Sequence, residues 1–286
     1  MRIQNTLRFL AGRLALIGIA LLFSYVTRGA EPAPGALTAW RSHVEQAKAE
    51  LEASADCQPG PFLLVDRYQK EAGKAHSGKI LALHAAGEGV LPVPSGLIHH
   101  WTGIVYVPNV RAAAVLRALK DYDSYAAIYQ PAVTKSRLLN HAGNEFRYRL
   151  EFQAKGFGIK SGLRGDFRST YVSLDARQGY SVTEATRLVE LEHPGTAEER
   201  EFSPAEAHGY IQRMFTIVRY REMGDGVVVE VETLTLSRDI PASVRWLVEP
   251  FVERFSKQVL TGTLEKFRDR VESLSQTNQL QMAGLP

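Results

Sequence analysis

Few residues in this sequence are spaced for catalysis or metal binding. His99 and His100 are adjacent, and neighbouring side chains on a strand point to opposite faces, so the pair cannot readily share a metal. The sequence has no HxH, HExxH or CxxC spacing, no GxSxG turn, and a single cysteine, Cys57. These patterns predict no catalytic residue, no metal and no cofactor. Acid or base chemistry inside a cavity stays open, because burial can shift the pKa of a carboxylate or histidine into a useful range.

Two glycine-containing stretches imitate nucleotide sites without the required context. The segment from Gly73 to Lys79 has the spacing of a P-loop, but Ile80 follows where that motif needs Ser or Thr at a helix start. A second set lies between two expected strands with no helix after it, and consists of Gly156, Gly158, Gly162 and Gly165. This position indicates a hairpin loop rather than a dinucleotide site.

The elements that would position a site begin after a separate leader. Residues 1–29 place three arginines before an apolar run from Leu14 to Val26 and end in small residues, which is the layout of a secretory signal peptide. The run has 13 residues, short of the roughly 20 that a spanning helix needs, so an uncleaved membrane anchor is the weaker alternative. We expect a secreted or periplasmic protein after cleavage.

The net charge limits the classes of partner, and the cysteine content limits the compartment. The leader holds four basic and no acidic residues, so its removal lowers the formal net charge from +3 to −1. A nucleic-acid binder would keep a basic footprint, and we therefore expect no nucleic-acid partner. One cysteine allows no disulfide within the chain, which favours a bacterial periplasm over a disulfide-dense secreted protein.

The rest of the chain divides into a helical and a strand-rich region. We expect an N-terminal helical extension and loop over 30–96, a larger domain over 97–275 and a disordered tail over 276–286. Within the extension, residues 37–55 are expected to form an amphipathic helix whose apolar stripe is Leu37, Trp40, Val44, Ala47 and Leu51. The larger domain reads as one strand, two helices, six strands and a long helix. The two short helices carry a stripe of tyrosines, namely Tyr122, Tyr125 and Tyr129. These residues are interpreted either as part of the core or as a gate at the mouth of a cavity.

One strand shows the pattern most clearly. Between Glu145 and Gln153, apolar and aromatic residues alternate with charged or polar ones. Such a strand has one apolar face that must be buried, and the long final helix is the available cover. Charged residues elsewhere on the strands are interpreted as cross-strand pairs on the solvent face. The alternative is that one or two arginines, of which Arg213 and Arg219 are the least certain, point inward to an anionic head group.

Two stretches carry a resemblance to a known superfamily. They are IHHWTGIVYVPNV, running into VLRALKDYDSYAAIYQPAVTKSRLL, and LSRDIPASVRWLVEPFVERFSKQVLTGTLEKFRDRV. Together with the element order they resemble the START-like superfamily, also called SRPBCC, over about 98–271. The resemblance implies an α+β helix-grip fold, in which a curved seven-stranded antiparallel sheet wraps around the long C-terminal helix and leaves a cavity.

The resemblance also implies a function. Members bind lipids, sterols or other apolar small molecules, so we expect a hydrophobic or amphipathic ligand. A transient membrane contact is compatible with this expectation, and the resemblance identifies no protein partner. The lining we expect is Phe146, Tyr148, Leu150, Phe152, Phe167, Phe215, Phe255, Val259 and Gly262. Two alternatives stay open: a cyclase-like or hydratase-like enzyme acting on such a ligand, and a noncatalytic envelope module with a filled core that binds a protein.

Gly262 breaks the pattern of the final helix. Counted from Phe251, one apolar stripe runs into Gly262, where a glycine costs roughly 1 kcal/mol relative to alanine. A second stripe, rotated around the helix, consists of Leu260, Leu264, Phe267 and Val271. We expect Gly262 to leave room for a ligand on the face that looks into the sheet; close packing against a strand is the alternative. Pro250 is expected in the first turn of this helix.

Overall fold

The computed structural model describes residues 31–56, 61–67, 69–85, 89–156, 159–239 and 242–282. Within its helices and strands, side chains are described except at 67, 69–72, 154–156, 159–160, 242–255 and 278–282. The expected signal peptide over 1–29 and the thiol of Cys57 therefore lie outside the described residues.

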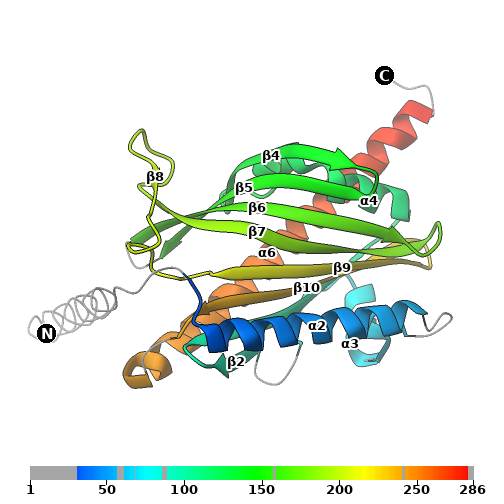
Figure 1. The fold of residues 1–286 in the computed structure, drawn as a ribbon. Helices are drawn as coiled ribbons and strands as arrows, with labels where there is room; N and C mark the ends of the chain where they lie inside the picture. The colour runs from blue at the N-terminus through cyan, green and yellow to red at the C-terminus, as the bar shows by residue number, and fades with distance from the viewer. Residues whose placement is uncertain are drawn as a thin grey trace, which may run out of the picture.

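An antiparallel sheet forms the centre of the described chain (Figure 1). Its ten strands follow the order β1-β3-β10-β9-β7-β6-β5-β4, with β2 paired to β3 and β8 paired to β7. The long strands are β3 (Gly96–Val107), β4 (Val133–Ala142), β5 (Glu145–Gly156), β6 (Ile159–Ser173), β7 (Gln178–Glu192), β9 (Arg213–Met223) and β10 (Gly226–Arg238). The short strands are β1 (Leu81–His84), β2 (Val90–Val93) and β8 (Arg200–Glu201).

The seven long strands are the strands predicted from the sequence. The predicted total of seven is too low, because the three short strands also join the sheet. The sequence indicates a strand over 78–83, which overlaps β1, but this strand is not counted in the predicted sheet. β2 and β8 have two to four residues, too few to show a clear alternation of apolar and polar residues.

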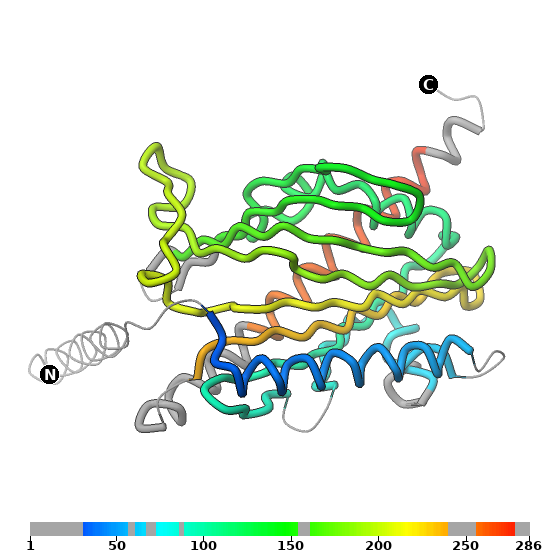
Figure 2. Tube along the Cα trace, viewed as in Figure 1, coloured from blue at the N-terminus to red at the C-terminus, as the bar shows by residue number. Residues whose placement is uncertain are grey.

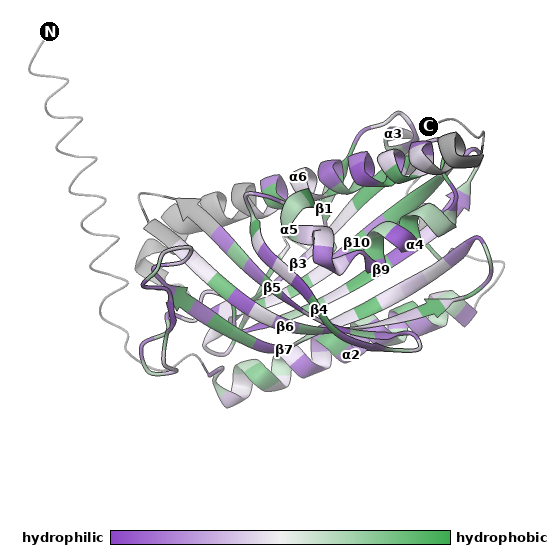
Figure 3. Ribbon diagram, turned by 90° about the horizontal axis from the view of Figure 1, so that it is seen from above, coloured by the Kyte–Doolittle hydropathy of each residue, from purple (hydrophilic) through white to green (hydrophobic). Residues whose placement is uncertain are grey.

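Helices cover both faces of the sheet. They are α2 (Pro34–Asp56), η1 (Leu64–Arg67), α3 (Gln69–His76), α4 (Ala112–Lys120), η2 (Tyr122–Ser124), α5 (Tyr125–Ile128) and α6 (Ala242–Met282). In Figure 1, α2 lies in front of the sheet and α6 behind it, and the view from above in Figure 3 agrees. We call these two sides the α2 face and the α6 face. The α+β helix-grip fold expected from the sequence is therefore confirmed.

Three predicted boundaries change. The predicted boundary between 30–96 and 97–275 does not divide the fold, because β1 and β2 pair with β3 and α2 packs on the same sheet. Figure 2 shows α2, in blue, running alongside that sheet. The predicted tail over 276–286 is also wrong in its first part, since α6 continues to Met282. Pro250 lies inside α6 rather than in its first turn.

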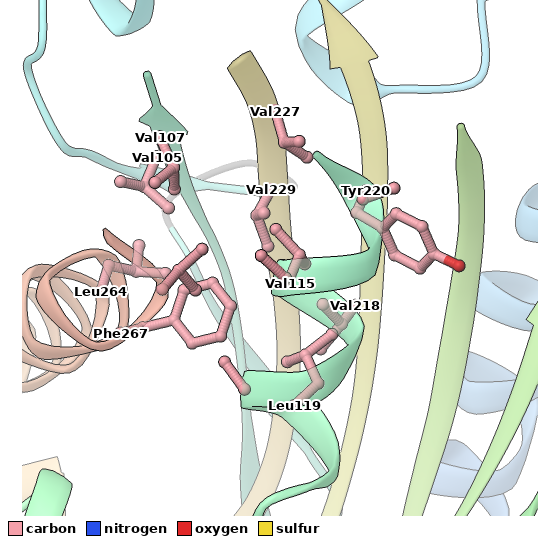
Figure 4. Close-up of a cluster of buried hydrophobic side chains, with 14 of the residues drawn as sticks. Val105, Val107, Val115, Leu119, Val218, Tyr220, Val227, Val229, Leu264 and Phe267 are labelled. Carbon is pink, nitrogen blue, oxygen red and sulfur yellow. The ribbon is translucent and has the colours of Figure 1, made fainter. Parts of the chain in front are cut away.

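The α6 face is solidly packed at one end. Side chains of β3, β9 and β10 contact α4 and α6 there. Figure 4 shows the labelled side chains of both helices pointing toward the strands. The residues labelled in that view are Val105, Val107, Val115, Leu119, Val218, Tyr220, Val227, Val229, Leu264 and Phe267, and all are buried. This end of the fold forms a continuous hydrophobic core.

The α2 face has a core of its own. The buried apolar residues of α2 recur every three or four positions, as the predicted amphipathic helix requires, and are Ala36, Trp40, Val44, Ala47 and Leu51. They pack on the residues of β3, β9 and β10 that point away from α6: Ile98, Ile104, Tyr106, Phe215, Ile217, Val228, Leu234 and Leu236. The central strands are therefore buried on both sides.

The helices carry no membrane-spanning signal. Although α6 has 41 residues, charged residues recur along it, and none of the described helices combines the length and apolar character needed to cross a bilayer.

Candidate functional site

The long helix α6 packs on the sheet through one stripe and one strand glycine. Leu264, Phe267 and Val271 are buried, and Leu260 packs beside them. A Cβ built on Gly103 of β3 would lie 2.6 Å from Leu264 Cδ1 and 2.9 Å from Leu260 Cγ. The glycine that permits close contact between helix and sheet is therefore Gly103, in the strand.

Gly262 fulfils neither expectation drawn from the sequence. It is two residues from both Leu260 and Leu264, and positions two apart are about 200° apart around a helix, so it points away from the sheet. Within the described part of the chain, a Cβ at Gly262 would meet no atom within 4 Å. The predicted room toward the sheet and the alternative of close packing are both wrong, because the rotated stripe is the one that contacts β3.

Five predicted lining residues do lie on the α6 face. Phe146, Tyr148, Leu150, Phe152 and Phe167 all belong to the cluster beneath α4 and α6. The ring of Tyr148 stacks on that of Phe167 with 5.4 Å between centroids, and Phe152 meets Phe167 edge-on at 6.1 Å. The alternation in β5 therefore placed its aromatic face correctly.

The other predicted lining residues differ. The prediction that Phe215 lines the site is wrong, because Phe215 lies on the α2 face and packs beneath α2 with Ile217 and Leu234. Val259 is on α6 and 42% exposed. The side chain of Phe255 lies outside the described residues. The sequence could not assign Phe215 to a face, because β9 carries apolar residues on both.

Tyrosines fix the η2–α5 segment against β5 and β6. Tyr122 stacks on Tyr148 with ring centroids 3.9 Å apart, and its hydroxyl is 2.6 Å from that of Tyr171. Tyr125 and Tyr171 donate to the carbonyl of Leu119 at 2.7 and 2.9 Å. Burial raises the pKa of Tyr122, Tyr125 and Tyr171. These phenols therefore stay protonated near neutral pH and serve as hydrogen-bond donors rather than bases.

The α6 face is incompletely covered between α6 and the η2–α5 segment. α6 covers β3 and the η2–α5 segment covers β5 and β6, whereas β7, β9 and β10 lie in between. Several side chains on this face of the three central strands are only half-buried. We name them the open zone: Thr183, Met214, Thr216, Val231, Thr233 and Thr235. Met214 and Val231 pack on the α6-face cluster. Residues two apart on a strand share a face, so Thr216, Thr233 and Thr235 also lie on the α6 face, and Thr183 does so because it pairs with Thr216.

A cluster of buried charges lies on the opposite, α2 face. Arg219 is 2% exposed and its Nη1 donates to Glu232 Oε2 at 2.7 Å. His100 Nε2 is 2.7 Å from Glu232 Oε1, and His43 of α2 lies 3.2 Å from the other ring nitrogen of His100. Burial alone would raise the pKa of Glu232, but the hydrogen bond from His100 and the charge of Arg219 outweigh it and lower that pKa. The alternative that Arg219 meets a head group beneath α6 is wrong.

A second buried carboxylate fastens the N-terminal region to the sheet. Glu230 is fully buried and accepts the backbone N–H groups of Leu64 and Val65, each at 2.7 Å. Burial raises its pKa to about 7, although those N–H groups and Arg219 favour the charged form. The sequence offered a signal for this cluster, namely two glutamates within the apolar run VVVEVETLTL, and the interpretation as surface pairs missed it.

The side chains around the open zone are suited to binding an apolar molecule. The open zone offers hydroxyl groups, a thioether and a branched apolar side chain. One titratable side chain, His99, shares this face because it pairs with Thr235, and burial lowers its pKa to about 4, so it is neutral near pH 7. The buried glutamates Glu230 and Glu232 are on the other face. No group of three His, Cys, Asp or Glu side chains in the described ranges is placed to hold a metal ion. The arrangement can therefore bury an apolar surface and hydrogen-bond to it.

Comparisons with known proteins return distant structural likenesses. A scan against family models finds no match, and neither does a search of curated proteins. A STAR-related lipid transfer protein fragment from Xanthomonas axonopodis is similar, with 18% identity over 68% of this chain and 98% of that chain, at a TM-score of 0.45. The Zhui aromatase/cyclase from Streptomcyes sp. R1128 has 17% identity over 61% of this chain and 96% of that chain, at a TM-score of 0.41.

A START superfamily protein from Mycobacterium smegmatis has 14% identity over 62% of this chain and 99% of that chain, at a TM-score of 0.41. These likenesses are too distant to carry a function across. The chain's own topology, an antiparallel sheet with α6 packed across one face, is that of a helix-grip fold.

Proposed function

We propose that this protein binds a hydrophobic or amphipathic small molecule on the α6 face, between the sheet and α6. The observation that carries the proposal is the open zone. Side chains on the three central strands of a sheet with helices on both faces would be fully buried in a solid core, yet this set is only half-buried. The neighbouring aromatic rings of β5 and β6 add apolar surface, which favours binding by about 25 cal/mol per Å² removed from water.

The same proposal extends to location and exchange. We place the protein outside the cytoplasm, on the signal-peptide pattern of residues 1–29. An insoluble ligand would need a transient membrane contact to enter or leave, as the resemblance to START-like proteins suggests.

Native mass spectrometry of the protein purified from its own host tests the proposal. The expected result is a mass adduct that organic extraction removes and identifies. Repeated spectra without any adduct would refute the proposal, provided that added hydrophobic probes also fail to bind.

A matched pair of variants locates the site. Met214 and Met223 lie on the same strand, but Met214 packs on the α6-face cluster and Met223 on the α2-face cluster. Met214→Glu should weaken binding of the fluorescent hydrocarbon pyrene at least about tenfold, because an apolar ligand would desolvate the new charge. Met223→Glu should leave pyrene binding unchanged. Equal loss in both variants would place the ligand elsewhere.

A further inference from the structure

A row of hydroxyl groups crosses the α6 face. The strand register pairs Thr233 of β10 with Thr216 of β9, Thr216 with Thr183 of β7, and Thr183 with Ser169 of β6. Directly paired residues share a face, so four consecutive strands present one hydroxyl each in a line, with Cβ atoms about 4.5–5.5 Å apart. We call these four residues the hydroxyl row; Trp101 of β3 extends it beyond Thr233.

The hydroxyl row is unusual for a face that packs beneath a helix. The neighbouring rows are more apolar: Val231 pairs with Val218 on one side and Met214 lies on the other, and each of these rows holds a single hydroxyl residue, Ser181 and Thr235 respectively. Valine has nearly the shape of threonine and would fill these positions without a polar group. The chain instead places hydroxyls at the centre of the open zone, where an apolar ligand alone gains nothing from them.

Half of the hydroxyl row is unpaired. Ser169 and Thr183 hydrogen-bond to each other at 2.5 Å, and Ser169 also donates to Tyr148 Oη at 3.3 Å. The hydroxyls of Thr216 and Thr233 have no protein partner among the described residues, and both side chains are half-buried and reachable from solvent. They are therefore available to a bound molecule.

The adjoining indole gives a second, independent sign. Trp101 is 4% exposed, and within the described chain its Nε1–H has no acceptor. Its register partners are Thr233 of β10 and His84 of β1, so Trp101 lies on the same face at the end of the hydroxyl row, and its ring meets that of His84 edge-on with 4.3 Å between centroids. A buried donor without an acceptor is destabilising and calls for an explanation, and an acceptor atom of a bound molecule supplies one.

We infer that the molecule bound on the α6 face is amphipathic and carries at least two oxygen atoms that hydrogen-bond to Thr216 and Thr233, one of them within reach of the Trp101 indole. This inference rests on the proposed function and adds the ligand's chemical class: an oxygenated molecule rather than a pure hydrocarbon. Its oxygens lie along the edge that faces the sheet, spaced like adjacent strands at about 4.8 Å. Its apolar part contacts Met214 and the aromatic rings of β5 and β6.

Two probes separate the oxygen contacts from the apolar ones. Pyrene fluorescence reports the affinity for a molecule without oxygen. Displacement of pyrene by 1-monodecanoylglycerol reports the affinity for a molecule with an ester and two hydroxyls. The variants are Thr216→Val with Thr233→Val, which remove both hydroxyls and keep the shape, and Thr216→Ser, which keeps the hydroxyl. Thr170→Val is the matched control, since Thr170 lies on the opposite face, paired with Val182.

The double valine variant should bind 1-monodecanoylglycerol about tenfold or more weakly, since each lost hydrogen bond contributes about 0.5–1.5 kcal/mol. Its affinity for pyrene should be unchanged or higher. Trp101→Phe should weaken binding of the glycerol ester severalfold with little effect on pyrene. Thr216→Ser should bind the glycerol ester more tightly than the double valine variant does, because it keeps the hydroxyl, and Thr170→Val should behave as the unsubstituted protein.

Three results would overturn the inference. The first is an unchanged affinity of the double valine variant for the glycerol ester, and the second is an equal loss for both probes, which would mean that the hydroxyl row acts through shape alone. The third is pyrene binding that no glycerol ester displaces from the unsubstituted protein. If neither pyrene nor the glycerol ester binds the unsubstituted protein, the proposed function itself fails.

Discussion

Two glycines make opposite predictions about the packing of α6. Gly103 lies on β3 beneath the helix, where an added Cβ would be 2.6 Å from Leu264 Cδ1 and 2.9 Å from Leu260 Cγ. Both distances are shorter than carbon atoms tolerate, and Leu264 is buried at 1% exposure, so neither leucine can move aside into solvent without losing its own contacts. Gly262 has open space where its Cβ would be.

The magnitudes follow from these contacts. Gly103→Ala should lower the free energy of unfolding by about 1–3 kcal/mol, the usual cost of overpacking a filled core. Gly262→Ala should raise it by up to about 1 kcal/mol, because alanine has a higher helix propensity and meets no clash. Urea denaturation monitored by circular dichroism measures both, with the slope of the transition checked for a change in the unfolded state.

The reasoning is refuted if the signs reverse. A stable Gly103→Ala protein would mean that α6 does not approach β3 as described. A Gly262→Ala protein that loses more than about 1 kcal/mol would restore the close-packing role for the helix glycine. Gly262→Leu extends the test, because it should leave pyrene binding unchanged if Gly262 points away from the sheet.

Three further predictions concern the α2 face and the leader. The folded-state pKa of Glu230, about 7, is above the ordinary 4.5, so its contribution to stability is fully present below about pH 4.5 and is lost as the pH rises through 7. The difference in unfolding free energy between the unsubstituted protein and Glu230→Gln should therefore fall by on the order of 3 kcal/mol between pH 4.5 and 7.5 in urea titrations; a flat difference contradicts this. The comparison with the variant is needed because His99, whose pKa burial lowers to about 4, changes stability in the opposite direction over part of that range. Arg219→Met should cost about 3–5 kcal/mol by leaving Glu232 buried without its cation, whereas Arg168→Met, which breaks the more exposed pair with Glu184, should cost less than about 1 kcal/mol in the same assay; similar losses would show that burial of the pair does not matter. Amino-terminal sequencing of the protein recovered from its host should begin near residue 30, and an intact leader would show that the segment remains attached.

The sequence alone determined the elements and their order. Runs of strand-forming residues bounded by turn signals marked the seven long strands. Alternation at period two assigned the aromatic face of β5 correctly, because Phe146 and Tyr148 have only charged or polar neighbours. The helical period of α2 likewise predicted its buried stripe. These are local properties, set by the geometry of a single strand or helix.

Tertiary structure decided which face each ambiguous element buries. β9 is apolar on both sides, so only the packing of α2 against one face and α4 with α6 against the other places Phe215 away from the expected site. α6 has two apolar stripes, and the choice between them depends on Gly103, a residue about 160 positions earlier that lets Leu260 and Leu264 approach β3. The hydroxyl row exists only through the register of four strands, because its members are distant in sequence and become neighbours when the sheet forms.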